Sequence, residues 1–372
     1  MLTKIIIGPI EKIDLINLNI KNIISRIDTG AHLSTISASS VTVKPNGLEV
    51  IFFDPNSVYF TGHKMVFKHY DYIKIKSSNG PGNYTTKRLK EASIDLGHEV
   101  RVINYAKCYV TLEKNEPKVY YMGEEVKDVD IVIPRIAQNL TKYGSAIVRQ
   151  FEMQNVFTTA SSISIVRSRD KLRSMQLLSK AGIGIPKTVF ARDTSDFDGV
   201  IEQVGGAPVI IKVARGTHGN GVVLAETKKA AKAVMQAFYV EGVSFLVQEF
   251  IQESAGTDIR ALVINGKVVA SILRQSLDDD FRANTHQGGV GKIVHLTDEE
   301  KKTAQKAARA TGLTVCGVDM MRSERGPLVL EVNSSASIKT PELITGKDVA
   351  TQIVNYAVLA ARAGRHKDRI GA

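Results

Sequence analysis

Residues 316–333 read CGVDMMRSERGPLVLEVN, and this stretch decides the fold prediction for the C-terminal part of the chain. Two apolar runs, CGVDMM and PLVLEVN, flank the polar residues 322–326, so we expect an antiparallel hairpin. With the turn centred near Arg325, Asp319 and Glu331 lie opposite each other on one face. Asn333 then points the same way, because side chains alternate along a strand.

This hairpin is a candidate metal site. Unpaired carboxylates at the edge of an apolar sheet repel each other and are costly to bury unless a hard cation neutralises them. Magnesium, bound by a few carboxylates and by substrate phosphates, suits the set Asp319, Glu331 and Asn333. The alternative is a solvated hairpin whose charges lie on its outer face.

The second signal is APVIIKVARGTHGNGVVLAE at residues 207–226. Lys212 follows a buried apolar run, an expensive place for an ammonium group unless an anion meets it. Gly216, Gly219 and Gly221 follow in a polar loop that can lay backbone N–H groups over phosphates. The pattern is neither a Walker loop nor a dinucleotide fingerprint. An ordinary hairpin turn is the alternative.

Further candidates come from segments near these two signals. The backbone at residues 248–251 could bond an adenine edge, and Asp258 could accept from ribose hydroxyls. Arg274 and the run 282–284 carry guanidinium and amide donors suited to a triphosphate or an acyl phosphate. The alternatives are a core strand with a surface turn, and a surface salt-bridge cluster with the acids at 278–280. Lys171 can equally be a solvated helix residue.

Composition and charge narrow the class of protein. The 372 residues are 43% hydrophobic and 23% charged, which is typical of a folded chain. The formal net charge of +11 favours anionic partners such as a nucleotide, an acidic peptide or a nucleic acid. The two cysteines fit a reducing cytosol. No apolar stretch approaches the roughly 20 residues of a membrane span, so we expect a cytoplasmic protein without membrane contact.

The pattern of elements predicts an α/β fold. Residues 1–71 are β-rich. A strand near 72–76, a turn-rich loop, a helix over 85–97 that stops at Gly97 and a strand at 99–104 then predict a parallel sheet. A buried strand is expected at 129–136. A helix is expected over 168–181, closed by Gly182, and strands and helices alternate from there to about residue 360.

Ten stretches resemble the RimK family of the ATP-grasp superfamily in order and spacing, between about residues 72 and 356. They are VIPRI, YGSAIVRQFEM, RSRDKLRSMQLL, VGGAPVIIK, GVVLAET, LVQEFI, DIRALV, FRANTHQGG, CGVD and GPLVLEVN. The resemblance implies an ATP-grasp fold with ATP held between two subdomains. The regions it implies are a pre-ATP-grasp parallel-sheet domain at 72–167, a central subdomain at 168–255 and a C-terminal subdomain with the metal site at 256–372.

The resemblance also implies an activity. ATP phosphorylates a carboxylate, and an amine attacks the resulting acyl phosphate to form an amide. L-Glutamate, or a similar amino acid, is added to the acidic C-terminus of a protein or peptide, a small-subunit ribosomal protein among the candidates. ATP, two Mg²⁺ or Mn²⁺ ions and a homotetramer are implied as well.

Site residues carried over by motif fall into three groups. The nucleotide-binding residues implied are Lys171 and Lys212 at the phosphates, Glu249 and Phe250 at the adenine, Asp258 at the ribose, and Arg282, Ala283 and Asn284 at the phosphates. The catalytic residues implied, which neutralise the transferring phosphoryl group, are Lys212, Arg274 and Arg282. The metal ligands implied are Asp319, Glu331 and Asn333.

Two segments depart from the family pattern. Residues 334–339 read SSASIK where RimK-like proteins read like Ala-Ser-Pro-Gly-Leu-Glu-Gly, which leaves the added amino acid and the acceptor open. Residues 26–31, with Ser34 and Ile36, resemble the retropepsin-like ATP-dependent zinc protease domain that some RimK proteins carry, here truncated. An aspartic protease needs two aspartates, so Asp28 would need a second lobe or a dimer partner. A docking or dimerisation module and a structural turn are the alternatives.

Two rival functions follow from these features. One is a non-catalytic ATP-binding regulator of translation with a basic surface for ribosomal RNA, but a chain with no Trp and 6% aromatic residues offers few stacking groups. The other is an aspartic-type peptidase that uses Asp28.

Overall fold

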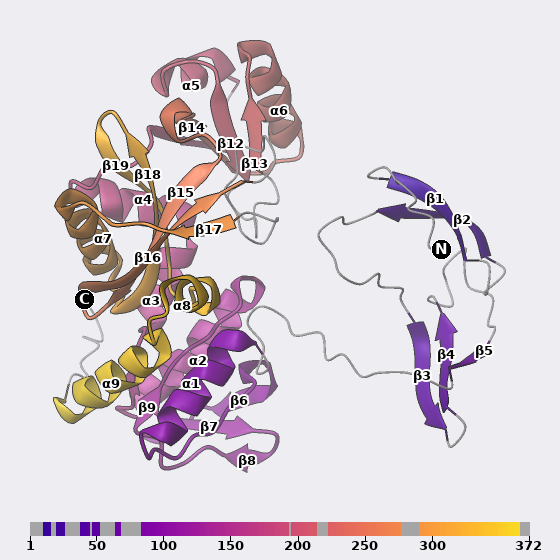
Figure 1. The fold of residues 1–372 in the computed structure, drawn as a ribbon, viewed down its shortest axis with the longest axis vertical. Coiled ribbons are helices and arrows are strands. Elements are labelled where there is room, and N and C mark those ends of the chain that lie inside the picture. Colours follow the sequence, from indigo (N-terminus) through magenta and orange to yellow (C-terminus); the bar gives the residue numbers. More distant parts are fainter. Residues whose placement is uncertain are drawn as a thin grey trace. The chain divides into compact units, whose positions relative to one another are not determined.

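The computed structural model describes residues 10–15, 20–26, 38–44, 47–52, 64–67, 83–192, 195–213, 222–276 and 290–364, which fall into two compact units, Met1–Ile75 and Lys76–Ala372 (Figure 1). The first unit contains β1 (Ile10–Leu15), β2 (Ile20–Arg26), β3 (Ala38–Lys44), β4 (Gly47–Phe52) and β5 (Lys64–Phe67). They form two antiparallel sheets, β1-β2 and β3-β4-β5. The protease-like motif around Asp28 lies outside the described residues.

The second unit begins with a region of short strands and two longer helices. Its elements are α1 (Tyr84–Asp95), η2 (Tyr105–Lys107), β6 (Cys108–Thr111), β7 (Lys118–Tyr121), β8 (Glu124–Glu125), β9 (Ile131–Val132), η3 (Gln138–Leu140), α2 (Thr141–Met153) and β10 (Phe157–Thr158). The Asn83 side chain accepts from the backbone N–H of Thr86 and caps α1, and Gly97 follows its end at φ +80°. This helix and its glycine stop were predicted.

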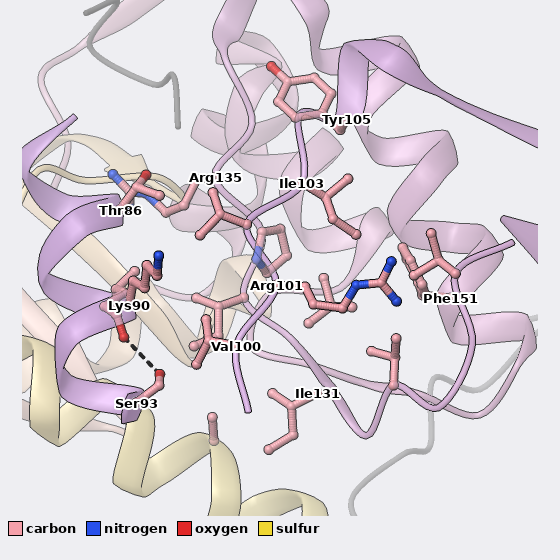
Figure 2. A pocket seen from close by; sticks show the side chains of 18 of the residues that line it. Thr86, Lys90, Ser93, Val100, Arg101, Ile103, Tyr105, Ile131, Arg135 and Phe151 are labelled. Carbon is pink, nitrogen blue, oxygen red and sulfur yellow. Dashed lines mark hydrogen bonds between the residues drawn. The ribbon is translucent and has the colours of Figure 1, made fainter. Parts of the chain in front are cut away.

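The strand predicted near 72–76 lies outside the described residues, and among the described residues the parallel sheet is smaller than predicted. β9 and β10 form the one parallel ladder among the described residues. Residues 99–104, predicted as a strand, belong to no strand, and the strand predicted at 129–136 is confined to β9. Both stretches line a cavity of about 460 Å³, seen in Figure 2 with Val100 and Ile131 among its walls. A strand needs a neighbouring strand for its backbone hydrogen bonds. Among the described residues, no strand pairs with residues 99–104.

Two helices connect this region to the four-stranded sheet that follows in the chain. They are α3 (Ser162–Arg169) and α4 (Lys171–Lys180). The single helix predicted over 168–181 is therefore wrong at its start, because Asp170 ends α3 and its side chain accepts from the N–H of Arg173 to cap α4. Its predicted end is confirmed, with Gly182 at φ +65°.

A four-stranded sheet with two helices on one face follows. Its order is β11-β14-β12-β13, and the elements are β11 (Thr188–Ala191), α5 (Phe197–Gln203), β12 (Val209–Val213), β13 (Val222–Ala225), α6 (Lys228–Val240) and β14 (Phe245–Glu249). Val209 and Ile211 pack in the core with α5 and α6. Lys212 alternates with them and therefore points to the opposite face.

A five-stranded antiparallel sheet of order β17-β16-β15-β18-β19 completes the fold. Its elements are η4 (Gln252–Ser254), β15 (Thr257–Ile264), β16 (Lys267–Gln275), β17 (Val290–Ile293), α7 (Asp298–Thr311), β18 (Val315–Ser323), β19 (Gly326–Asn333), α8 (Lys339–Thr345) and α9 (Val349–Arg362). Figure 1 shows α7 beside β18 and β19. Residues from α3, α4 and α7 form the core on one face, and residues from α1 and α9 form the core on the other.

Apolar side chains on both faces place this sheet between helices. On β18, Val318 and Met320 belong to the core beneath α7, so Asp319 between them points to the other face. None of the helices in the described ranges is long and apolar enough to cross a bilayer.

Candidate functional site

The hairpin of β18 and β19 brings the three predicted metal ligands together. Asp319 is paired with Glu331 across the ladder. The Nδ2 atom of Asn333 donates to Oε1 of Glu331 at 2.8 Å and lies 3.5 Å from Oδ2 of Asp319. The predicted convergence of two acids and an amide is confirmed, whereas the role of these side chains as metal ligands stays a prediction.

A β-bulge makes this pairing possible. The turn is centred between Glu324 and Arg325, slightly earlier than predicted. An uninterrupted ladder from that turn would pair Asp319 with Leu330 and send Glu331 to the opposite face. The register shifts beside Asp319, so that the extra residue on β19 brings Glu331 opposite Asp319.

Asp319 is held by two arginines from the neighbouring strands. It is 2% exposed. Arg260 on β15 donates to it from Nε at 2.7 Å and from Nη2 at 2.6 Å. Arg274 on β16 donates from Nη2 at 2.8 Å and also binds both oxygens of Asp258 at 2.5 Å. Two acids and two guanidiniums thus form a closed, charge-balanced network.

Burial and pairing act in opposite directions within this network. Burial would raise the pKa of Asp319, but the charges of Arg260 and Arg274 outweigh it and hold that pKa well below its usual range. Burial raises the pKa of Asp258 to about 6, despite its pairing with Arg274. The pKa of Arg274 lies above its ordinary value, because Asp319 and Asp258 more than offset burial.

Glu331 lies among basic side chains from three other elements. Its negative charge raises the pKa of Lys212 on β12, of Lys171 on α4 and of Arg169 on α3. Burial has the larger effect on all three and lowers their pKa values, that of Lys212 to about 8. The Nζ atom of Lys171 donates to the carbonyl oxygen of Val213 at 3.2 Å. Half-buried cations gathered around one acid are arranged to receive an anion.

The hairpin turn is tied to the strand predicted to contact adenine. The Arg325 guanidinium donates to the Glu249 carboxylate, which also accepts from the N–H of Lys187 at 2.7 Å. Ser254 donates through Oγ to the carbonyl oxygen of Arg322 at 2.6 Å. These bonds hold the end of β14 against the turn between β18 and β19, so the two sheets meet there.

The loop after Asn333, residues 334–338, is anchored by the region around α1 and β9. Arg135 donates from Nη1 and Nη2 to the carbonyl oxygens of Ala336 and Ser335, each at 2.9 Å. The N–H of Ile338 donates to Oγ1 of Thr85 at 3.3 Å. The loop that departs from the family pattern therefore has defined contacts.

Several predicted site residues make contacts other than those predicted, or lie outside the described part of the chain. Asp258 and Arg274, predicted at the ribose and the phosphates, pair with each other. Arg274 belongs to a buried network and not to a surface cluster. The glycine loop at 216–221 and the run 282–284, with Arg282, Ala283 and Asn284, lie outside the described residues. Glu249 is held by Arg325 as above, and Phe250 follows it half-buried.

Glu331 and Asn333 offer oxygen donors for a divalent cation, and Asp319 would join them only through oxygens that already accept from Arg260 and Arg274. Two carboxylates and an amide give hard oxygen donors of the type that magnesium prefers. Within the described ranges, no group of three His, Cys, Asp or Glu side chains lies close enough to hold a metal. The acid–amide set on β18 and β19 is therefore the candidate, and its few ligands suit a metal that also binds phosphate oxygens.

Four arginines of this site were not predicted from the sequence: Arg135, Arg169, Arg260 and Arg325. Arg260 could have been found, because it alternates with Asp258 on β15 and must share its face. The other three arginines reach their partners from distant segments, and no local pattern indicates those contacts.

Comparisons with protein families and their members agree with this architecture. The RimK-like ATP-grasp domain family matches residues 168–357, and the RimK PreATP-grasp domain family matches residues 73–165. A probable α-L-glutamate ligase of Syntrophotalea carbinolica is 50% identical over 292 residues, which cover 78% of this chain and 97% of that protein. Probable α-L-glutamate ligase 2 of Pseudoalteromonas atlantica is 51% identical over 286 residues, 77% of this chain and 95% of that protein.

Solved structures share the fold at low sequence identity. The ATP-grasp ligase PsnB, solved with a minimal precursor, Mg and ADP, has a TM-score of 0.59 at 18% identity over 76% of this chain and 96% of its own. A RimK domain ATP-grasp protein from Sphaerobacter thermophilus has a TM-score of 0.57 at 20% identity over 74% of this chain and 96% of its own. The predicted mixed α/β architecture of an ATP-grasp domain with a pre-ATP-grasp domain is confirmed.

Proposed function

This chain belongs to the RimK-like ATP-grasp family as an ATP-dependent α-L-glutamate ligase, and from that premise we propose that it adds L-glutamate to the C-terminal carboxylate of an acidic protein or peptide. A small-subunit ribosomal protein is one candidate acceptor. The nucleotide is bound with two divalent ions, Mg²⁺ or Mn²⁺.

One observation carries the proposal. Glu331 and Asn333 lie beside Asp319 on one sheet, and the charge of Glu331 acts on Lys212 from the other sheet. Oxygen ligands for a metal and a cation for phosphate thus face the same space. The strong net charge of +11 also suits a nucleotide, a dicarboxylic amino acid and an acidic acceptor together.

The chemistry requires no protein nucleophile. A carboxylate oxygen of one substrate attacks the γ-phosphorus of ATP and releases ADP, and the amine nitrogen of the other then attacks the acyl carbon and releases phosphate and a proton. A bound divalent metal neutralises charge on the transferring phosphoryl group. Lys212 and Lys171 add positive charge from the side of the four-stranded sheet. In a partly buried site, this charge interacts more strongly with a phosphoryl group than it would in water. The protein positions the reactants.

The direct test is a ligation assay on the full chain. We expect a peptide with an acidic C-terminus, incubated with ATP, magnesium and L-glutamate, to gain the mass of one or more glutamyl residues. The same peptide with an amidated C-terminus gains none, because it offers no carboxylate for phosphorylation. Each other amino acid is supplied in turn as a control. Phosphate release without any amino acid joined to the peptide would contradict the proposal.

Lys212 makes nucleotide affinity depend on pH. Its pKa of about 8 in the free protein rises when a phosphate binds, so binding takes up a proton above pH 8. The affinity for ADP is therefore expected to fall by up to about tenfold per pH unit above that value. Calorimetric titrations from pH 7 to pH 9.5 measure this slope. Lys212→Gln should flatten it, and an unchanged slope in that variant would exclude Lys212 as the phosphate ligand.

A further inference from the structure

Two neighbouring arginines, Arg135 and Arg169, form no hydrogen bond or ion pair with an acidic side chain among the described residues. Arg135, after β9, donates only to the backbone carbonyl oxygens of residues 335 and 336. Arg169, the last residue of α3, donates from Nη2 to the carbonyl oxygen of Ile136 at 2.9 Å. The Nε atoms of both arginines are buried and find no hydrogen-bond partner in the described part of the chain.

Burial makes the charged forms of Arg135 and Arg169 energetically unfavourable. Burial lowers the pKa of Arg135 to about 10, and the charge of Arg169 lowers it further. Burial lowers the pKa of Arg169 as well. Arg274 in the same unit is saturated by two carboxylates, so this fold does neutralise a buried guanidinium elsewhere. Two half-buried guanidiniums whose Nε atoms are buried, and whose hydrogen bonds go only to backbone carbonyl oxygens, are expected to bind an anion.

The pair lies next to the proposed site of phosphoryl transfer. The carbonyl oxygens that Arg135 binds belong to the loop directly after Asn333, and the charge of Glu331 acts on Arg169. Ser334, 6% exposed in the same loop, has an Oγ atom that is buried without a partner in the described ranges. Three donor groups with unused hydrogen-bonding capacity therefore lie beside one end of β19.

The arginines and the lysines approach Glu331 from different parts of the fold. Lys212 lies on the four-stranded sheet, and Lys171 is bonded to the end of the same strand β12. Arg135 instead follows β9, and lines the cavity of Figure 2 with residues of the pre-ATP-grasp region. Nucleotide phosphates account for the lysines. A planar guanidinium pair suits an anion with two coplanar oxygens, which is a carboxylate.

We propose that Arg135, Arg169 and Ser334 form a subsite for a substrate carboxylate, separate from the lysines that meet the nucleotide. The inference rests on the proposed ligase function and names which side chains recognise its acid substrate. Carboxylate chemistry is shared by the amino acid that is added, L-glutamate, and by the acidic C-terminus of the acceptor. The loop at 334–338 belongs to this subsite, so its sequence contributes to substrate choice.

Equilibrium binding tests the subsite independently of turnover. L-Glutamate and a tetraglutamate peptide are titrated separately into the ADP- and magnesium-loaded protein, as wild type, Arg169→Gln and Ser334→Ala. We expect Arg169→Gln to weaken one of the two ligands by about 10- to 100-fold, the loss of charge-assisted hydrogen bonds, and Ser334→Ala to weaken the same ligand less. Arg169→Lys, which keeps the charge but not the planar fork, should restore part of the affinity. The ligand that weakens is the one that the subsite binds.

The matched control is Arg173→Gln, the same substitution at an exposed arginine of α4. It should leave both affinities unchanged. The affinity for ADP should stay within about twofold in every variant, and thermal unfolding shows whether each variant is folded. If Arg169→Gln does not fold, Ser334→Ala carries the test. The proposal is overturned if both ligands bind the variants as they bind wild type, or if ADP weakens equally. Failure of the ligase function appears instead as absence of product in the ligation assay.

Discussion

Glu331→Gln is expected to lower the rate of glutamate ligation by about 10³-fold or more while the protein stays folded. The glutamine keeps the size of the side chain but removes the negative charge that lies opposite Asp319 and faces Lys212 and Lys171. Glu331 is exposed and Asn333 can still be bonded by the amide, so stability should change little. The initial rate of ADP formation with glutamate and acceptor measures the loss.

Glu324→Gln is the matched control for this substitution. Glu324 lies in the turn of the same hairpin, and its side chain is exposed and away from the paired acids. Its removal should leave the ligation rate within about twofold of wild type. If Glu331→Gln retained more than a tenth of the wild-type rate, the hairpin would not be the site of phosphoryl transfer.

Asp319→Asn should lower the free energy of unfolding by about 3–5 kcal/mol and abolish ligation as well. The substitution removes the acid that neutralises Arg260 and shares Arg274 with Asp258. At least one buried guanidinium then lacks its counter-charge. Urea denaturation of the full chain, followed by far-ultraviolet circular dichroism, measures the change.

The coupling within this network can be isolated. Arg260→Met alone should also destabilise the protein, because it leaves a buried carboxylate charge with one guanidinium fewer. The double variant Asp319→Asn/Arg260→Met should cost less than the sum of the two single changes. Asp298→Asn, at an exposed acid of α7 that pairs with Lys301, should change stability by less than about 0.5 kcal/mol. Additive effects in the double variant would mean that Asp319 and Arg260 do not act as a pair.

Local sequence patterns predicted much of the fold and the core of the site. Patterns of neighbouring residues predicted three elements: the helix before Gly97, the end of the helix before Gly182 and the hairpin at 316–333. Short-range backbone sterics and side-chain alternation govern these features, so a single sequence carries them. The strand predicted at 99–104 was wrong, because apolar alternation indicates an extended chain but cannot supply the neighbour with which it must pair.

Amino-acid order alone therefore determined that residues 316–333 form a hairpin that carries two acids and an amide, and that a lysine follows a buried apolar run. Tertiary structure decided how those groups are used. The register shift beside Asp319 lets Glu331 face it, the arginines of β15 and β16 neutralise Asp319, and Arg135 reaches the loop after Asn333 from about two hundred residues away in the chain. Electrostatic energy depends on distance in space and on burial, and both are set by packing between segments that are remote in the sequence.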